Sequence, residues 1–248
     1  GAKAGLSAET TTEQTGGRTR MTIERAPAMD DYEDFPLPLQ LGWMGDQPLL
    51  LASGSQTRMA MLIDAGLPIM VAPSDIDESV IKQRVRSEGG AASVAAAELA
   101  AAKAATVSRA HTGQITVGAD QILVLEDEQG QEIWFDKPED RGQAHQTLQT
   151  LSGKTHRLMT ATAVCLDGEI RWSSLTSPTL SMRALSDTFI WAYLDTLGDE
   201  ALWSVGAYQL EGLGSQLFER VEGDFFTILG LDLTGLLQHF RDNRALLA

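Results

Sequence analysis

The residues best suited to chemistry begin at a turn rich in serine and glycine. Ser53, Gly54 and Ser55 follow a short apolar run that predicts a buried strand, and Arg58 lies three residues further on. We expect Ser55 to cap a helix over residues 56–65. Free backbone N–H groups and the helix dipole make such a turn an anion site, and glycine lets the anion approach the backbone closely. Phosphate is the expected anion, and a plain helix cap is the alternative.

Carboxylates occur at two further places. Residues 74–78, with Glu78 last, form an acidic loop after a predicted strand, and their oxygens could hold a hard cation such as magnesium. A solvated acidic turn is the alternative for this loop. Asp120 ends a predicted strand of apolar and small residues, so we expect it at a sheet edge facing a cleft, as a general base or metal ligand. A structural helix cap is the competing interpretation of Asp120.

Among the lysine, histidine and cysteine residues, one lysine is a further candidate for the site. Lys137 lies between a predicted strand end and a helix start, where its flexible ammonium could reach a phosphate. An exposed surface lysine is the alternative. The four histidines show no zinc-ligand spacing, and Cys165 lies within a predicted strand. We therefore expect neither a zinc site nor thiol catalysis.

The composition limits the classes of partner. The chain has 248 residues and is 43% apolar, which is enough for one large domain or two small ones. Its net charge of -15 would repel a nucleic-acid backbone, so polymeric DNA or RNA is not an expected partner. A single cysteine excludes an internal disulfide framework and fits the cytoplasm. No apolar run reaches the roughly 18 residues of a membrane helix, so we expect no membrane partner.

Strands and helices must position these residues. Residues 1–47 lack sustained periodicity and are interpreted as a flexible extension, followed by one domain over residues 48–248. The alanine-rich residues 91–110 predict a packed helix, and Asp167 and Gly168 predict a hairpin turn. This mixture predicts an α/β fold with a mixed, twisted sheet flanked by helices, two lobes and a central cleft. The other predicted elements are strands over residues 67–71, 115–125, 155–166, 169–182 and 225–229, and helices over residues 139–151, 187–197 and 234–247.

Taken in chain order, residues 49–237 resemble the Maf family of nucleotide pyrophosphatases. The family's opening motif, L-A-S-x-S-P-R-R, is similar to residues 51–58, in which Gln56 and Thr57 replace a proline and an arginine. Its closing V-x-G-L-P is similar to residues 228–232, where an aspartate replaces the proline. The matches between them are D-I-D-E at 75–78, a helical lysine at Lys103, G-A-D at 118–120, K-P at 137–138, L-S-G-x-x-H at 151–156, G-A-Y at 206–208 and E-G-L-G at 211–214.

The resemblance implies a reaction and a role for each matching residue. A nucleoside triphosphate would be hydrolysed between its α and β phosphates with a divalent cation, Mg²⁺ or Mn²⁺. Asp120 would accept the proton of the attacking water and, with Glu78, help to hold the metal. Arg58, Lys103 and Lys137 would stabilise phosphate charge. The residues that would contact the substrate are Ser53, Ser55, Thr57, Arg58, Gln121 and Glu211.

Three positions bear on the identity of the base. The subgroup of the family that acts on dTTP and UTP typically has Arg at Thr57, Thr at Gln121 and Gln at Glu211. Gln121 and Glu211 instead resemble the subgroup that prefers 7-methyl-GTP, where an acidic side chain could accept hydrogen bonds from guanine and favour a positively charged base. A 7-methyl-GTP-like substrate is therefore favoured. Tyr208 looks more like the pyrimidine subgroup, which keeps a dTTP or UTP pyrophosphatase as an alternative.

Two further functions stay open as alternatives. The inosine and xanthosine triphosphate pyrophosphatases share the architecture, but their usual opening motif is absent from this sequence. Maf proteins have been linked to cell-division arrest, so a non-catalytic nucleotide-binding regulator is also considered. The changes at Gln56 and Thr57 favour that regulator. The residues that argue for catalysis are the retained Glu78, Lys103, Asp120 and Lys137. A homodimer is the assembly that the resemblance suggests.

Overall fold

A mixed sheet of eight strands is the centre of the computed structural model, which describes residues 42–247. Its strands are β1 (Leu49–Leu51), β2 (Ile69–Val71), β3 (Thr116–Glu126), β4 (Glu132–Phe135), β5 (Thr155–Leu166), β6 (Glu169–Thr176), β7 (Thr179–Met182) and β8 (Phe218–Glu222). Their order is β2-β1-β3-β5-β7-β8, with β4 paired to β3 and β6 paired to β5. β1 runs parallel to β2 and β3, and the other pairs are antiparallel. The predicted α/β class with a mixed sheet is confirmed.

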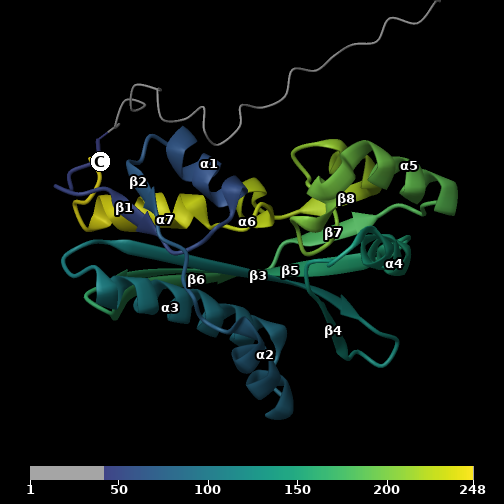
Figure 1. The fold of residues 1–248 in the computed structure, drawn as a ribbon, viewed down its shortest axis with the longest axis horizontal. Helices are drawn as coiled ribbons and strands as arrows, with labels where there is room; N and C mark the ends of the chain where they lie inside the picture. Colours follow the sequence, from purple (N-terminus) through teal and green to yellow (C-terminus); the bar gives the residue numbers. More distant parts are fainter. Residues whose placement is uncertain (1–41, 248) are drawn as a thin grey trace, which may run out of the picture. The chain divides into compact units, whose positions relative to one another are not determined.

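Helices cover the sheet on both faces (Figure 1). They are α1 (Gln56–Asp64), α2 (Glu78–Ser87), α3 (Ala92–Ala110), α4 (Arg141–Leu151), α5 (Asp187–Leu197), α6 (Phe225–Ile228) and α7 (Leu233–Asp242), with 3₁₀ helices at Gly198–Leu202 and Leu213–Leu217. α3 has no side-chain cap of its own, and Glu132 of β4 accepts a hydrogen bond from its Ala92 N–H at 2.7 Å. Among residues 42–247, no helix combines the length and the hydropathy of a bilayer-spanning segment.

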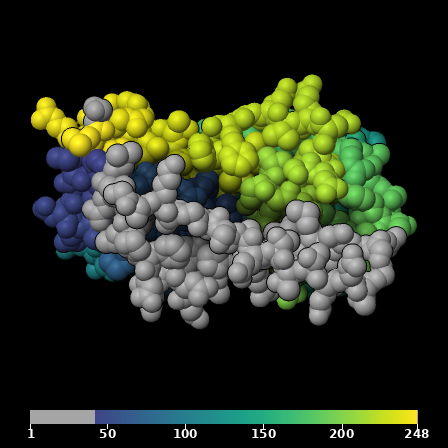
Figure 2. Space-filling model, turned by 90° about the horizontal axis from the view of Figure 1, so that it is seen from above, coloured from purple at the N-terminus to yellow at the C-terminus, as the bar shows by residue number. Residues whose placement is uncertain are grey.

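Alternate residues of β3 face opposite layers, because successive side chains of a strand point to opposite faces. Ile122 faces α3, which covers one side of the sheet. On the other side, Val117 packs in a cluster with α1 and α7, whereas Leu123 packs in a cluster with α4 and α5. Gln121 lies in the strand between these two clusters and belongs to neither. Figure 2 shows the two groups at opposite ends of this side, with purple and yellow residues at one end and green residues at the other.

Four elements differ from their predictions, and one of them is the helix predicted over residues 234–247, which ends at Asp242 of α7. Residues 225–229, predicted as a strand, contain helix α6, because Asp224 accepts a hydrogen bond from Thr227 N–H and caps a helical turn. Residues 169–182, predicted as one strand, form β6 and β7 with a break that includes Pro178, which has no N–H to donate to a strand ladder. The acidic residues 74–78 were predicted as a loop, but Glu78 already begins α2.

Residues next to the predicted domain boundary pack against the end of the chain. Trp43 forms an isolated β-bridge with Leu246, and its indole lies edge-on to Phe240 with ring centroids 5.6 Å apart. Met44 N–H donates to Ala245 O at 3.0 Å. These contacts attach this part of the predicted extension to α7, because a large aromatic side chain has apolar area to bury. Residues 1–41 of that extension lie outside the described residues.

Candidate functional site

The candidate site lies at a gap along one edge of β3. On that edge, β1 pairs with β3 as far as Val117, and pairing with β4 begins at Leu123. Residues 118–122 therefore present their outer backbone edge to side chains instead of to a neighbouring strand. Asp120 lies in the middle of this gap and inside β3, which continues to Glu126, whereas the sequence predicted it at the end of a strand. The gap is also at the carboxyl end of β1, where α/β sheets commonly bind ligands.

A cavity of about 460 Å³, the charged cavity, opens at this gap. Lys103 is central to it, because its Nζ lies 2.7 Å from Asp120 Oδ1 and 2.7 Å from Glu78 Oε1. Asp120 is 5% exposed, and its Oδ2 has no hydrogen-bond partner within the described residues. One carboxylate oxygen is thus held while the other is available. The predicted site residues that line this cavity are Ser53, Ser55, Thr57, Arg58, Glu78, Lys103, Asp120, Gln121 and Lys137.

Close packing of α3 on β3 brings Lys103 to Asp120. A Cβ added at Gly118 would lie 2.3 Å from Ala100 O and 2.7 Å from Ala104 N, so a larger residue would push the helix away. Asp120 points to the same face of β3 as Gly118, because the two residues are two positions apart. Lys103 extends from the adjacent turn of α3. Small residues on both elements therefore set the distance of this ion pair.

Arg58 joins the serine turn to two distant segments. Its Nη1 donates to Ser53 Oγ at 3.1 Å and to Ala119 O at 3.0 Å, and its Nε donates to Gly230 O at 2.8 Å. Ser55 Oγ accepts from Arg58 N–H at 3.3 Å and caps α1. The helix cap considered as an alternative is therefore present, within a turn that also lines the charged cavity. No group within residues 42–247 accepts a hydrogen bond from Nη2, which leaves its two hydrogens for an anion.

Burial and neighbouring charges shift three pKa values in this cavity. Burial lowers the pKa of Arg58, against the opposite effect of two nearby carboxylates. Burial acts to raise the pKa of Glu78, but the hydrogen bond and charge of Lys103, with other cations, lower it overall. Burial, followed by the charge of Arg58, lowers the pKa of Lys137. Four cations and three carboxylates line the cavity, so it is locally positive in a chain of net charge -15 and favours an added anion.

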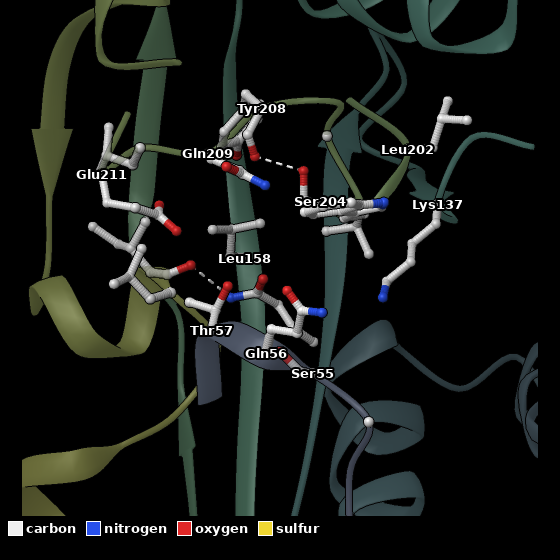
Figure 3. Close-up of a pocket in the computed structure, with 18 residues that line it drawn as sticks. Ser55, Gln56, Thr57, Lys137, Leu158, Leu202, Ser204, Tyr208, Gln209 and Glu211 are labelled. Carbon is white, nitrogen blue, oxygen red and sulfur yellow. Dashed lines mark hydrogen bonds between the residues drawn. The ribbon is translucent and has the colours of Figure 1, made fainter. Parts of the chain in front are cut away.

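A second cavity of about 330 Å³ adjoins the charged cavity and is bordered by the loop over residues 202–211 (Figure 3). Gln121 and Trp203 are among the residues that line both cavities. Glu211 and Lys137 lie on opposite sides of the second cavity in Figure 3. Apolar side chains line much of the space between them. Its volume is in the range of small-ligand pockets, roughly 300 to 1,000 Å³.

A buried histidine and tyrosine support the loop that borders the second cavity. His156 is 1% exposed, and its Nε2 lies 2.7 Å from Tyr208 Oη. The Tyr208 ring packs edge-on against Phe218, and its carbonyl accepts a hydrogen bond from Ser204 Oγ (Figure 3). Burial lowers the pKa of His156 to about 4, so the ring is neutral near pH 7. The L-S-G-x-x-H and G-A-Y motifs, distant in sequence, thus meet to support the loop.

The residues predicted to contact the base line this second cavity. Thr57 and Gln121 lie where it meets the charged cavity, and Glu211 lies at its far side (Figure 3). The Nε2 of Gln121 donates to Thr160 Oγ1 at 2.8 Å and to the carbonyls of Thr227 and Ile228 at 3.1 and 3.0 Å. The cavity therefore joins strand β3, the serine turn and the loop before β8.

Glu78 and Asp120 are suited to hold a divalent cation. Both carboxylates contact the same ammonium of Lys103, and Asp120 Oδ2 is an unpartnered oxygen. In the described part of the chain, no group of three or more His, Cys, Asp or Glu side chains forms a metal cluster. Mg²⁺ usually binds one or two carboxylates and completes its shell with water and phosphate oxygens. The pair fits that mode, in which the substrate supplies further ligands.

Lys82 and Trp203 are among the lining residues that were not sequence candidates. Lys82 lies in the charged cavity with its Nζ 2.5 Å from Asp136 Oδ1, and it follows Glu78 by one helical turn of α2. That spacing would have identified Lys82 if the helix had been predicted. Trp203, which is 52% exposed, lines both cavities, and no sequence pattern marks it. Within the acidic loop, Asp77 caps α2 by accepting from the N–H of the second helical residue and lines neither cavity.

Comparisons with known proteins agree on one family. Residues 48–243 match a family model described as Maf-like protein. A protein of Paramagnetospirillum magneticum named nucleoside triphosphate pyrophosphatase is 45% identical over 194 residues, which cover 78% of this chain and 97% of that protein. A Rhodospirillum rubrum protein of the same name is 42% identical over 201 residues, which cover 81% of this chain and 97% of that protein. A Mesorhizobium japonicum protein named 7-methyl-GTP pyrophosphatase is 43% identical over 195 residues, which cover 79% of this chain and 96% of that protein.

Proposed function

Because the chain belongs to the Maf family, we propose that it is a nucleoside triphosphate pyrophosphatase. The reaction cleaves the anhydride between the α and β phosphates and releases the nucleoside monophosphate and pyrophosphate. One observation carries this proposal. Asp120 has one carboxylate oxygen held by Lys103 and the other without a partner among the described residues, at a cavity that four cations line.

Asp120 is the proposed general base. Its Oδ2 takes the proton of the attacking water, while the contact between Lys103 and Oδ1 keeps the carboxylate from turning away. The water oxygen forms a bond to phosphorus as the anhydride bond breaks, and pyrophosphate leaves with that electron pair. Arg58 through its Nη2, together with Lys137, stabilises the negative charge on the phosphate oxygens.

A divalent cation, Mg²⁺ or Mn²⁺, is part of the proposal. Glu78 and Asp120 hold it, because they supply oxygen ligands within the charged cavity. When bound, it neutralises phosphate charge and polarises the phosphorus–oxygen bonds. Lys103 holds the two carboxylates near each other and limits their mutual repulsion. The protein's own contribution is therefore a pair of oriented carboxylates.

A 7-methyl-GTP-like nucleotide is the proposed preferred substrate. Glu211 lines the second cavity and forms no ion pair within the described residues, so its charge favours a positively charged base. One relative carries the name 7-methyl-GTP pyrophosphatase. A dTTP or UTP pyrophosphatase is the second candidate, based on the resemblance of Tyr208 and its neighbours to the pyrimidine subgroup.

A nucleotide panel tests this function. The protein is incubated with Mg²⁺ and 7-methyl-GTP, GTP, ATP, dTTP or UTP, and pyrophosphate release is measured with and without a chelator. We expect release that depends on the metal, with the highest kcat/KM for 7-methyl-GTP. Higher kcat/KM for dTTP or UTP would support the pyrimidine alternative. Absence of release from every nucleotide, with nucleotide binding preserved, would favour the non-catalytic regulator of cell division.

Replacement of Asp120 tests the assigned base. Asp120→Asn keeps an acceptor for Lys103 but removes the basic oxygen, so we expect kcat to fall by about 100-fold or more. The matched control is Asp195→Asn, which changes a carboxylate of α5 outside both cavities and should keep the native rate. A folded Asp120→Asn variant that releases pyrophosphate at the native rate would contradict the role of Asp120.

We also propose that the protein is located in the cytoplasm and forms a homodimer. Cys165 is free and buried, and it is the chain's single cysteine, which suits a reducing compartment. The homodimer is based on the family resemblance. Light scattering during size-exclusion chromatography should give twice the mass of one chain, and a monomer mass would contradict it.

A further inference from the structure

Lys82 is a cation of the charged cavity that has no role in the proposed reaction. It lies on α2, four residues after Glu78, and the two side chains share one face of that helix. Lys82 lines the charged cavity but not the second cavity, and its side chain is 18% exposed. Its ammonium therefore adds a positive charge to the space in which the phosphates are proposed to bind.

A single carboxylate holds Lys82. Within residues 42–247, the Nζ of Lys82 makes one hydrogen bond, to Asp136 Oδ1 at 2.5 Å. An ammonium has three N–H donors, so two of them remain for a ligand. The Asp136 side chain is 61% exposed, and an ion pair with an exposed partner contributes little to stability. An anion that enters the cavity can therefore attract Lys82 away from Asp136, because no buried charge loses its partner.

The other three cations of this cavity are held or placed differently. Lys103 contacts two carboxylates, and the guanidinium of Arg58 donates to three oxygen atoms. Lys137 lines both cavities, so it lies at their junction. Lys82 differs from all three, because it has one exposed partner and lies outside the second cavity.

The proposed reaction places the parts of the nucleotide in order. The base occupies the second cavity, and the α phosphate lies beside Asp120, which takes the proton of the attacking water. The β and γ phosphates follow on the side away from the base, so they extend into the part of the charged cavity that the second cavity does not share. Lys82 and Asp136 line that part.

We propose that Lys82 binds the β and γ phosphates of the nucleotide and the pyrophosphate that leaves, and this inference rests on the proposed pyrophosphatase function. The leaving group gains negative charge as the bond between the α and β phosphates breaks, so a nearby ammonium stabilises it. Asp136 competes with the phosphates for the same ammonium. Asp136 therefore holds Lys82 before the nucleotide enters, and it takes Lys82 back as pyrophosphate departs.

Binding of inorganic pyrophosphate tests this inference without turnover. Isothermal titration calorimetry of the full chain with Mg²⁺ gives the Kd for pyrophosphate and, separately, for 7-methyl-GMP. Lys82→Met removes the charge but keeps an unbranched side chain, so we expect the Kd for pyrophosphate to rise about tenfold. The Kd for 7-methyl-GMP should stay native, because a monophosphate has no β or γ phosphate.

Two further lysine variants complete this measurement. Lys82→Arg keeps the positive charge, so it should retain most of the affinity for pyrophosphate. Lys154→Met is the matched control, because Lys154 is exposed and lies outside both cavities, and it should keep the native Kd.

Asp136→Asn distinguishes a ligand-binding role of Lys82 from a structural one. Lys82→Met and Asp136→Asn break the same ion pair, so a purely structural pair would make both variants bind pyrophosphate more weakly. Competition predicts opposite directions, because Asp136→Asn frees the ammonium and should lower the Kd for pyrophosphate about threefold. Asp195→Asn removes an exposed carboxylate from an ion pair with Arg141, outside both cavities, and should leave the Kd unchanged.

The outcomes separate this binding site from the reaction itself. A native Kd for pyrophosphate in a folded Lys82→Met variant, or an equal rise for pyrophosphate and 7-methyl-GMP, would overturn the inference. Weaker binding of pyrophosphate by Asp136→Asn would also overturn it. Circular dichroism and a thermal melt verify folding, and if Lys82→Met does not fold, Asp136→Asn still decides the inference. The expected changes in Kd without pyrophosphate release from any nucleotide would support the site but contradict the proposed function.

Discussion

The two adjoining cavities differ in how their polar side chains are held. In the charged cavity, Lys103 pairs with Glu78 and Asp120, and Lys82 pairs with Asp136, whereas Arg58 is held by backbone carbonyls. In the second cavity, polar side chains are held by backbone carbonyls and buried hydroxyls, as Gln121 is by α6 and Thr160. Ion pairs can exchange partners when a phosphate or a cation enters. A side-chain amide held by backbone groups keeps its donor and its acceptor in one orientation, which suits recognition of a base.

One strand contributes to both cavities. Asp120 and Gln121 are consecutive in β3, so their side chains point to opposite faces of the sheet. Asp120 meets α3 on one face, and Gln121 lies between the two hydrophobic clusters on the other. Changes to the charged cavity should therefore alter the rate of the reaction, and changes to the second cavity should alter the choice of nucleotide.

Of the changes that test this comparison, Lys103→Met should have the largest effect, because it keeps most of the side-chain length but removes the charge. Glu78 and Asp120 then lose their shared partner, and the phosphates lose a cation, so kcat should fall by about 100-fold. The ratio of kcat/KM for 7-methyl-GTP and UTP should stay native, because the second cavity is unchanged. Steady-state pyrophosphate release gives both quantities.

Lys154→Met is the matched control for that variant. Lys154 is exposed and lies outside both cavities, so its loss should leave kcat at the native value. A Lys103→Met variant with an unchanged rate would contradict the catalytic role of the ammonium. A change in its ratio of kcat/KM for 7-methyl-GTP and UTP would show that the two cavities do not act separately.

An intermediate effect is expected for Trp203→Ala. The exposed indole lines both cavities and can stack on a base, and loss of such a contact should raise KM by about tenfold with little change in kcat. The increase should be greater for 7-methyl-GTP than for GTP, because a positively charged base also gains a cation–π interaction. Trp191→Ala, which removes an indole that stacks on His145 outside both cavities, should leave KM unchanged.

The smallest expected effect is a pH dependence of the free energy of unfolding, caused by His156, which supports the loop that borders the second cavity. The pKa of His156 is lowered by burial to about 4 in the folded protein, from an ordinary value near 6.5. Between these values the unfolded chain binds a proton that the folded protein excludes, so the free energy of unfolding should fall as the pH is lowered from 6.5 toward 4. The slope from this group is on the order of 1 kcal/mol per pH unit.

Urea denaturation at pH 6.5, 5.5 and 4.5 measures that slope. His156→Gln keeps a polar atom near Tyr208 but does not titrate, so its free energy of unfolding should depend less steeply on pH than that of the native protein. Other titrating groups are common to both proteins and cancel in the difference. Equal slopes would contradict the burial of a neutral imidazole.

Local sequence specified much of the fold and the identity of the candidate site residues. The serine turn before α1, the alanine-rich helix α3 and the long strand β3 were all predicted, because helix caps, composition and apolar runs are local signals. The ordered match with the family motifs identified Asp120, Lys103 and Glu78. Helix α6 was predicted as a strand, because its short apolar run carries no helical period and Asp224 starts the turn.

Only the tertiary structure decided how those side chains are held. The ion pair between Lys103 and Asp120 depends on how closely α3 approaches β3 at Gly118, which is a packing distance between distant segments. The acceptor orientation of Gln121 depends on carbonyls more than a hundred positions away in the chain. Motifs therefore specified which side chains could take part in chemistry. Packing determined that Asp120 Oδ1 contacts Lys103 while Oδ2 has no partner within the described residues, because neighbours in space set which atoms form hydrogen bonds.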